Sequence, residues 1–254
     1  MEVKINPIHS AVFAPTGVGK GVNFVIPRLL EEPESMVIID FKGENAKKTA
    51  EFRKRFGQVV LLDPYRLVTK EPDTLNPLEF IDPEEPTAID SIRDIAEALV
   101  IRSGREAEPH WMDVAELWIG AMTAAVVFGR LGSVSLQSVR ELLTDPDKMA
   151  RAIELLCNAD DCDGMLSRLG NQLTHFVDKE RASTLTTANR FMRFLDTPVI
   201  AESTRASSFD PSGFRSGMTV YLIVPPDHAK GQSPLLRLWI ASLMRAVVRG
   251  GIRE

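Results

Sequence analysis

The chain has 254 residues, 44% of them hydrophobic, which is enough apolar material for one large buried core or for a core with a smaller second one. Its formal net charge of −5 excludes a protein that binds nucleic acid through overall positive charge, so any contact with phosphate must be local. Cys157 and Cys162 have no matching cluster of His or Cys, which favours reduced thiols over a zinc site.

The first quarter of the chain alternates apolar runs with segments of helical composition. The runs 10–14, 35–40 and 58–63 are predicted to be buried strands, and the segments between them, 19–32 and 43–57, are predicted to be helices. Strand and helix in alternation predict a parallel sheet covered by helices. A fourth apolar run, 217–227, is predicted to return to this sheet.

Between these strands lies a long stretch with helical periodicity. In 87–102, apolar residues recur at helical spacing and form one face of a predicted helix. Asp145 followed by Pro146 is typical of the start of a helix. The sequence therefore predicts an α/β domain with an all-α insertion. Its expected parts are 1–86 as the first half of the α/β domain, 87–195 as the insertion, and 196–254 as the second half. The face in 87–102 consists of Ile89, Ile92, Ala96, Leu99 and Val100.

The segment "APTGVGKG", residues 14–21, indicates a phosphate-binding loop between the first strand and the first helix. Gly17 and Gly19 suit a loop that turns backbone N–H groups inward, and Lys20 can reach terminal phosphates. Gly21 stands where a serine or threonine usually binds magnesium, and Ala14 replaces the first glycine of the pattern. A plain glycine turn without a ligand is the alternative interpretation.

A second candidate site follows the strand 35–40. Four apolar residues lead to Asp40, a pattern that also supports magnesium in nucleotide-hydrolysing enzymes. Alternatively, Asp40 caps the following helix, with Glu44 in its first turn. The two functions are compatible.

Several segments follow one another as in the coupling proteins of type IV secretion, the TraG/TraD-like ATPases of conjugative DNA transfer. The chain resembles this family over nearly its whole length. The segments are "FAPTGVGKGVNFVIPRLL", "VIIDFKGEN", "FRKRFGQVVLLDPY", "NPLEF", "HWMDVAELWIGAM", "STLTTANRFMRFLDTPVIAEST", "TVYLIVPPD" and "PLLRLWIASLM".

This resemblance implies a RecA-like P-loop fold and a membrane-anchored hexameric motor that uses ATP and Mg²⁺. Its expected location is the cytoplasmic face of the bacterial inner membrane. The motor would receive a relaxase-bound single strand of DNA or a protein effector and pass it to the secretion channel. The all-α domain would contact the relaxosome or the effector. The resemblance further implies that Lys20, Asp40 and Glu44 serve catalysis, that Asp40 serves the metal, and that the phosphates lie against Pro15, Thr16, Gly17, Val18, Gly19, Lys20 and Gly21.

Two departures from the family modify this expectation. No membrane span is predicted, because the longest apolar run, 234–251, is interrupted by Arg237 and Arg245. The chain also ends before the strand that carries the family's catalytic Asp-Glu pair, so the sheet is expected to be incomplete at the C-terminus and its edge exposed. We therefore expect nucleotide binding with very slow hydrolysis by this chain.

Two other functions fit the same residues. One is a non-hydrolysing adaptor that recruits substrates while nucleotide stabilises the fold. The other is an unrelated phosphotransferase, for which a basic lid would be expected. The arginines 168, 181, 190 and 193 are instead spread along predicted helices. His110 and Trp111 are candidates to face a substrate, with burial of Trp111 in the core as the alternative.

Overall fold

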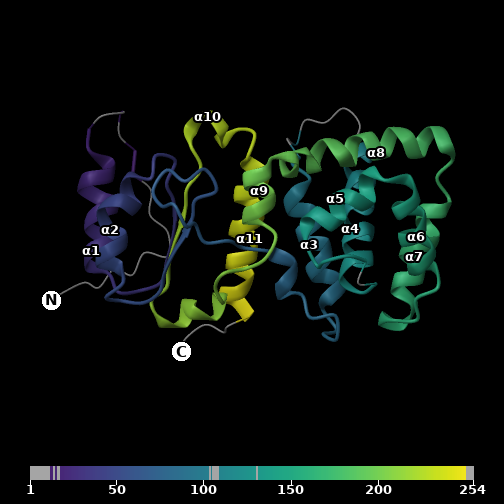
Figure 1. Cartoon of the computed structure of the whole chain (residues 1–254), viewed down its shortest axis with the longest axis horizontal. Coiled ribbons are helices and arrows are strands. Elements are labelled where there is room, and N and C mark those ends of the chain that lie inside the picture. The colour runs from purple at the N-terminus through teal and green to yellow at the C-terminus, as the bar shows by residue number, and fades with distance from the viewer. Residues whose placement is uncertain are drawn as a thin grey trace.

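The computed structural model describes residues 12–13, 15, 18–102, 104, 109–129 and 131–249. Figure 1 shows a small sheet with its helices at one end of the molecule and a bundle of helices at the other. The strands are β1 (Met36–Ile39), β2 (Val59–Leu62) and β3 (Thr219–Leu222). The helices are η1 (Gly21–Val25), α1 (Ile26–Glu31), α2 (Glu44–Arg53), η2 (Pro77–Phe80), α3 (Ala88–Leu99), α4 (His110–Val127), α5 (Leu136–Thr144), α6 (Pro146–Cys157), η3 (Cys162–Gly164), α7 (Met165–Thr174), α8 (Asp178–Met192), η4 (Arg193–Asp196), α9 (Pro198–Ser203), η5 (Pro211–Ser216), α10 (Pro226–Ala229) and α11 (Ser233–Arg249).

The three strands form a parallel sheet in the order β1-β3-β2. Thr219 at the start of β3 is in register with Met36 on one side and Val59 on the other. These are three of the four predicted strands, and their parallel arrangement is confirmed. Within the predicted strand 10–14, the two described residues Val12 and Phe13 belong to no strand and are 49% and 94% exposed.

Helices cover both faces of the sheet, as a parallel sheet requires. On one face Tyr221 and Ile223 pack with Leu29 of α1 and Ala46 of α2. On the other face Val220 and Leu222 join a larger core that includes residues of α11. Alternate residues of β2 and β3 therefore serve two different cores. In β1 only Met36 and Ile38 pack in the smaller core, while Val37 and Ile39 on the other face are 39% and 45% exposed.

The stretch between β2 and β3 is helical, as predicted, and α4 lies at its centre (Figure 1). Two-thirds of α4 is buried, and its Trp118 donates a hydrogen bond from Nε1 to Oγ1 of Thr184 on α8 at 3.0 Å. The predicted cap is confirmed, because Asp145 accepts hydrogen bonds from the backbone N–H groups of Asp147 and Lys148. The apolar face predicted in 87–102 is buried from Ile92 onward, while Ile89 is partly buried.

One continuous apolar core joins the helical bundle to the sheet. Helix α11 packs against α3 on one side and against the sheet on the other, and Trp239 at its centre is fully buried. The two ends of the molecule are thus mechanically connected through α11. None of the helices in the described part of the chain combines the length and apolar character that crossing a bilayer needs.

Candidate functional site

In the described part of the predicted phosphate-binding loop, Gly19 adopts a backbone conformation that favours glycine. Gly19 has φ +82°, in the left-handed region, and a Cβ atom there would lie 2.8 Å from Nδ2 of Asn23. A side chain at position 19 would therefore strain the backbone, and the side chain of Asn23 would have to move. Of the other predicted loop residues, Thr16 and Gly17 lie outside the described residues.

Lys20 closes the loop on itself. Its Nζ atom donates a hydrogen bond to the backbone carbonyl of Pro15 at 2.7 Å, which brings the ammonium group back over the start of the loop. The side chain of Lys20 is exposed, so its charge is accessible to an anion. This bond joins residues 15 and 20 across the loop; the binding of phosphates by residues 15–21 stays a prediction.

The helix after the loop begins with a widened turn. The N–H of Asn23 donates to the carbonyl of Gly19 at 2.8 Å. Residues Gly21–Val25 form the π-helical segment η1, closed by a bond from the N–H of Ile26 to the carbonyl of Gly21, and η1 continues into α1. A Cβ atom at Gly21 would meet no atom within 4 Å. The position where related loops carry a hydroxyl therefore has room for one.

Asp40 serves the helix cap that the sequence offered as one alternative. It follows β1, is 4% exposed, and accepts a hydrogen bond at Oδ2 from the backbone N–H of Ala46 at 2.9 Å. Gly43 turns the chain with φ +66°, and Glu44 is the first residue of α2. The carboxylate of Glu44 is placed to interact favourably with the positive end of the dipole of α2.

The loop and Asp40 belong to the same end of the sheet. Asp40 follows the carboxyl end of β1. In Figure 1, η1 begins on the upper side of the molecule, the side on which the chain after β3 enters α10. Ligands of open α/β sheets bind at this edge.

Two buried polar residues that the sequence analysis missed fix this region. Asp63, fully buried after β2, accepts backbone N–H bonds from Leu67, Val68 and Thr69. Arg53 of α2 is also fully buried. It donates to Oγ1 of Thr219 at 2.7 Å and to the backbone carbonyls of Leu29, Glu32 and Glu34.

Arg53 therefore ties the helix that follows the loop to the sheet. The residues whose carbonyls it binds lie at the end of α1 and in the turn to β1, and Thr219 begins β3. The sequence signal was weak, because Arg53 is one of three basic residues in "RKR" and nothing local distinguishes it from the exposed Lys54 and Arg55.

A stacked ring pair lies further along the same edge. The rings of Tyr65, after β2, and His228, in α10, stack with centroids 4.6 Å apart. Burial raises the pKa of Tyr65, and a hydrogen bond with the side chain of Gln232 opposes this rise. In the bundle, the other two predicted contact residues differ in exposure: His110 is exposed and Trp111 is half-buried.

Comparison with known proteins identifies the chain. The model of the family described as type IV secretory system conjugative DNA transfer matches residues 4–251. The chain belongs to this family. The conjugal transfer protein TraG of Escherichia coli is 26% identical over 256 residues, covering 94% of this chain and 39% of TraG. Protein VirD4 of Agrobacterium fabrum is 25% identical over 246 residues, covering 95% of this chain and 36% of VirD4.

Solved structures of a bacterial conjugative coupling protein have the same fold. The conjugative coupling protein TrwB without its first 70 residues aligns with a TM-score of 0.64 and 16% identity, covering 94% of this chain and 50% of that protein. TrwB in complex with ADP and Mg²⁺ aligns with a TM-score of 0.63 and 16% identity, covering 92% of this chain and 51% of that protein. The predicted fold class is confirmed. The chain spans about two-fifths of the length of TraG and VirD4.

Proposed function

We propose that the chain binds ATP with Mg²⁺ at the loop 15–21 and acts as the nucleotide-binding part of a coupling motor for type IV secretion. The observation that carries this proposal is the loop itself, where Gly19 has a left-handed backbone and Lys20 folds back to Pro15. Family membership over residues 4–251 supports it. TrwB, which shares the fold, has been solved with ADP and Mg²⁺ and with an ATP analogue.

Each loop residue has a distinct role in this proposal. The phosphates would lie against backbone N–H groups of the loop, namely those of Thr16, Gly17, Val18, Gly19, Lys20 and Gly21. Lys20 would exchange its bond with the Pro15 carbonyl for a bond with a phosphate oxygen. Magnesium supplies charge neutralisation between phosphate oxygens.

Asp40 and Glu44 are the proposed acidic partners of this site. Asp40 can assist the metal through a water molecule while its Oδ2 keeps the bond from Ala46. Glu44 is exposed at the start of α2 and is the remaining candidate to orient water.

The parts of the chain are proposed to divide the work. Residues 1–86 and 196–254 form the nucleotide-binding domain, and the all-α domain 87–195 contacts the relaxosome or an effector protein. In this proposal the whole protein is a hexamer at the cytoplasmic face of the inner membrane, and it delivers single-stranded DNA or protein to the secretion channel. The continuous core through α11 would transmit movement between the two domains.

A non-hydrolysing adaptor is the second candidate. The state of Asp40 favours it, because this carboxylate is nearly fully buried and already caps α2. In an adaptor, nucleotide would stabilise the fold and the all-α domain would recruit substrates. Release of phosphate from ATP by the chain that rises when DNA is added would exclude the adaptor.

Calorimetric titration tests nucleotide binding. The matched variants are Lys20→Ala in the loop and Lys47→Ala on the exposed side of α2. We expect Lys20→Ala to weaken binding of Mg-ATP at least ten-fold, because hydrogen bonds to charged groups contribute about 1.5–3 kcal/mol. Lys47→Ala should bind like the wild type. Equal affinity of all three proteins would exclude the proposed site.

A further inference from the structure

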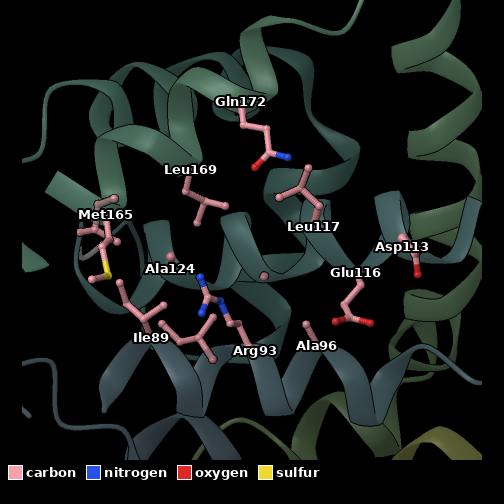
Figure 2. Close-up of a pocket in the computed structure, with 13 residues that line it drawn as sticks. Ile89, Arg93, Ala96, Asp113, Glu116, Leu117, Ala124, Met165, Leu169 and Gln172 are labelled. Carbon is pink, nitrogen blue, oxygen red and sulfur yellow. The ribbon is translucent and has the colours of Figure 1, made fainter. Parts of the chain in front are cut away.

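The helical bundle contains a pocket where α3, α4 and α7 meet (Figure 2). Its volume is about 250 Å³. The pocket exists because small residues face one another here, namely Ala96 on α3 with Gly120 and Ala124 on α4. A Cβ atom at Gly120 would have only the Cβ of Ala96, at 3.7 Å, within 4 Å. Larger side chains at these positions would close the space.

Most of the pocket wall is apolar. Ile89 and Ile92 come from α3, Leu117 from α4, and Leu166 and Leu169 from α7. These side chains offer a complementary surface to an aliphatic group, whose burial is favourable by roughly 25 cal/mol per Å².

One end of the pocket reaches solvent through an exposed apolar side chain. Met165, at the end away from Asp113 in Figure 2, is 46% exposed. Methionine is flexible and polarisable, and it packs against side chains of different shapes. It extends the apolar surface from the pocket onto the outside of the bundle.

The opposite end of the pocket is acidic. Asp113 and Glu116 of α4 share the guanidinium of Arg102, with O–N distances of 2.9 and 2.7 Å. Oε2 of Glu116 is buried beside the Arg102 guanidinium. Two carboxylates beside one guanidinium leave an excess of one negative charge.

The basic residue in the pocket does not reverse this balance. Arg93 of α3 has its charge matched by Asp90, whose Oδ1 lies 3.6 Å from Nη1. The acidic end disfavours phosphate groups, and among the described residues that line the pocket there is no aromatic ring on which a base could stack. The chemistry of the pocket therefore fits protein better than nucleic acid.

We propose that this pocket is a docking site for a segment of a partner protein, which inserts an aliphatic or methionine side chain and places a lysine or arginine beside Asp113 and Glu116. The inference rests on the proposed contact of the all-α domain with an exported protein, and it assigns that contact to a specific site and chemistry. An apolar anchor in a pocket with a charge at its edge is typical of a short recognition segment.

Fluorescence anisotropy with three labelled dodecapeptides tests the proposal on the whole 254-residue chain. The first peptide has a leucine and an arginine one helical turn apart, the second has glutamate in place of the arginine, and the third has serine in place of the leucine. We expect the first to bind at least five-fold more tightly than either of the others. Equal affinities, or tighter binding of the glutamate peptide, would overturn the proposal.

Two matched pairs of variants locate the binding. Gly120→Leu fills the pocket, whereas Gly120→Ala adds one methyl group at ordinary contact distance from Ala96. Glu116→Gln removes a charge inside the pocket, whereas Glu97→Gln removes one from an exposed position of α3 outside it. We expect at least a ten-fold loss of affinity in Gly120→Leu and about a five-fold loss in Glu116→Gln, with both controls near the wild type.

Nucleotide titration of the same variants separates this inference from the proposed function. If Gly120→Leu fails to fold, as judged by its circular dichroism, the Glu116 pair alone decides. Unchanged peptide affinity in Glu116→Gln, with Mg-ATP still bound in a Lys20-dependent manner, would refute the pocket and leave the nucleotide site intact. If the wild-type chain shows no binding of Mg-ATP, the proposed function is refuted instead.

Discussion

The buried guanidinium of Arg53 offers a quantitative test of how the region behind the loop is held. Replacing Arg53 with Met keeps much of the side-chain volume but removes donors to Oγ1 of Thr219 and to three backbone carbonyls. A buried acceptor left unpaired costs about 1–3 kcal/mol. If two of the four remain without a partner, Arg53→Met should lower the free energy of unfolding by about 2–6 kcal/mol.

Urea denaturation followed by tryptophan fluorescence measures this change. The control is Arg55→Met, because Arg55 is exposed and its guanidinium lies 4.8 Å from the centroid of the Phe52 ring, a contact worth about 0.5–1 kcal/mol. Arg53→Lys should recover only part of the loss, since one ammonium group cannot reach all four acceptors. A free energy of unfolding for Arg53→Met within about 0.5 kcal/mol of the wild type would refute the reasoning, because that is the range of ordinary surface substitutions.

Three further predictions concern the loop, the metal and pH. Gly19→Ala should destabilise the loop and weaken Mg-ATP binding. Gly21→Ser should fold normally and tighten magnesium-dependent ATP binding. Tighter Mg-ATP binding by Gly19→Ala than by Gly21→Ser, measured by calorimetry, would contradict both expectations. Asp40→Asn keeps an oxygen to cap α2, so its melting temperature should change little, whereas its magnesium-dependent ATP affinity should fall about ten-fold, and unchanged affinity would remove Asp40 from the metal site. The hydrogen bond from Arg140 lowers the pKa of Asp196, so this bond stabilises the fold above the ordinary aspartate pKa of 3.8 and is lost as the pH falls through the lower folded value. Asp196→Asn should therefore lower the melting temperature at pH 7 but much less near pH 2, and equal losses at both pH values would argue against an ionic contribution.

The strands of the sheet could be predicted because each is a short apolar run that ends in a polar turn. Runs 35–40, 58–63 and 217–227 contain β1, β2 and β3. The continuous apolar sequence fits best for β3, which is buried at every position, whereas Val37 and Ile39 of β1 are exposed. The helical stretch between β2 and β3 could be predicted from apolar residues that recur at helical spacing. The run 10–14 has the same composition, yet its described residues Val12 and Phe13 are not in a strand. Composition alone does not provide the neighbouring strand that pairing requires.

The polar contacts could not be predicted, because they join residues far apart in the sequence. Arg53 binds Thr219 across 166 positions, and no local pattern marks either residue. The pocket in the bundle is similarly hidden, since Gly120 reads as one small residue in an apolar helix until α7 is placed beside it. The loop around Lys20 was predictable because its function depends on consecutive residues.

Hydrogen–deuterium exchange with and without Mg-ATP tests the central claim most directly, because it reports where the nucleotide acts. We predict slower exchange in peptides that cover the loop and the start of η1, residues 15–25, in the wild type and in Lys47→Ala but not in Lys20→Ala. Peptides from α4 and α8 should change little in any of the three proteins. Protection confined to the helical bundle, or protection of the loop that persists in Lys20→Ala, would contradict a nucleotide site at this loop.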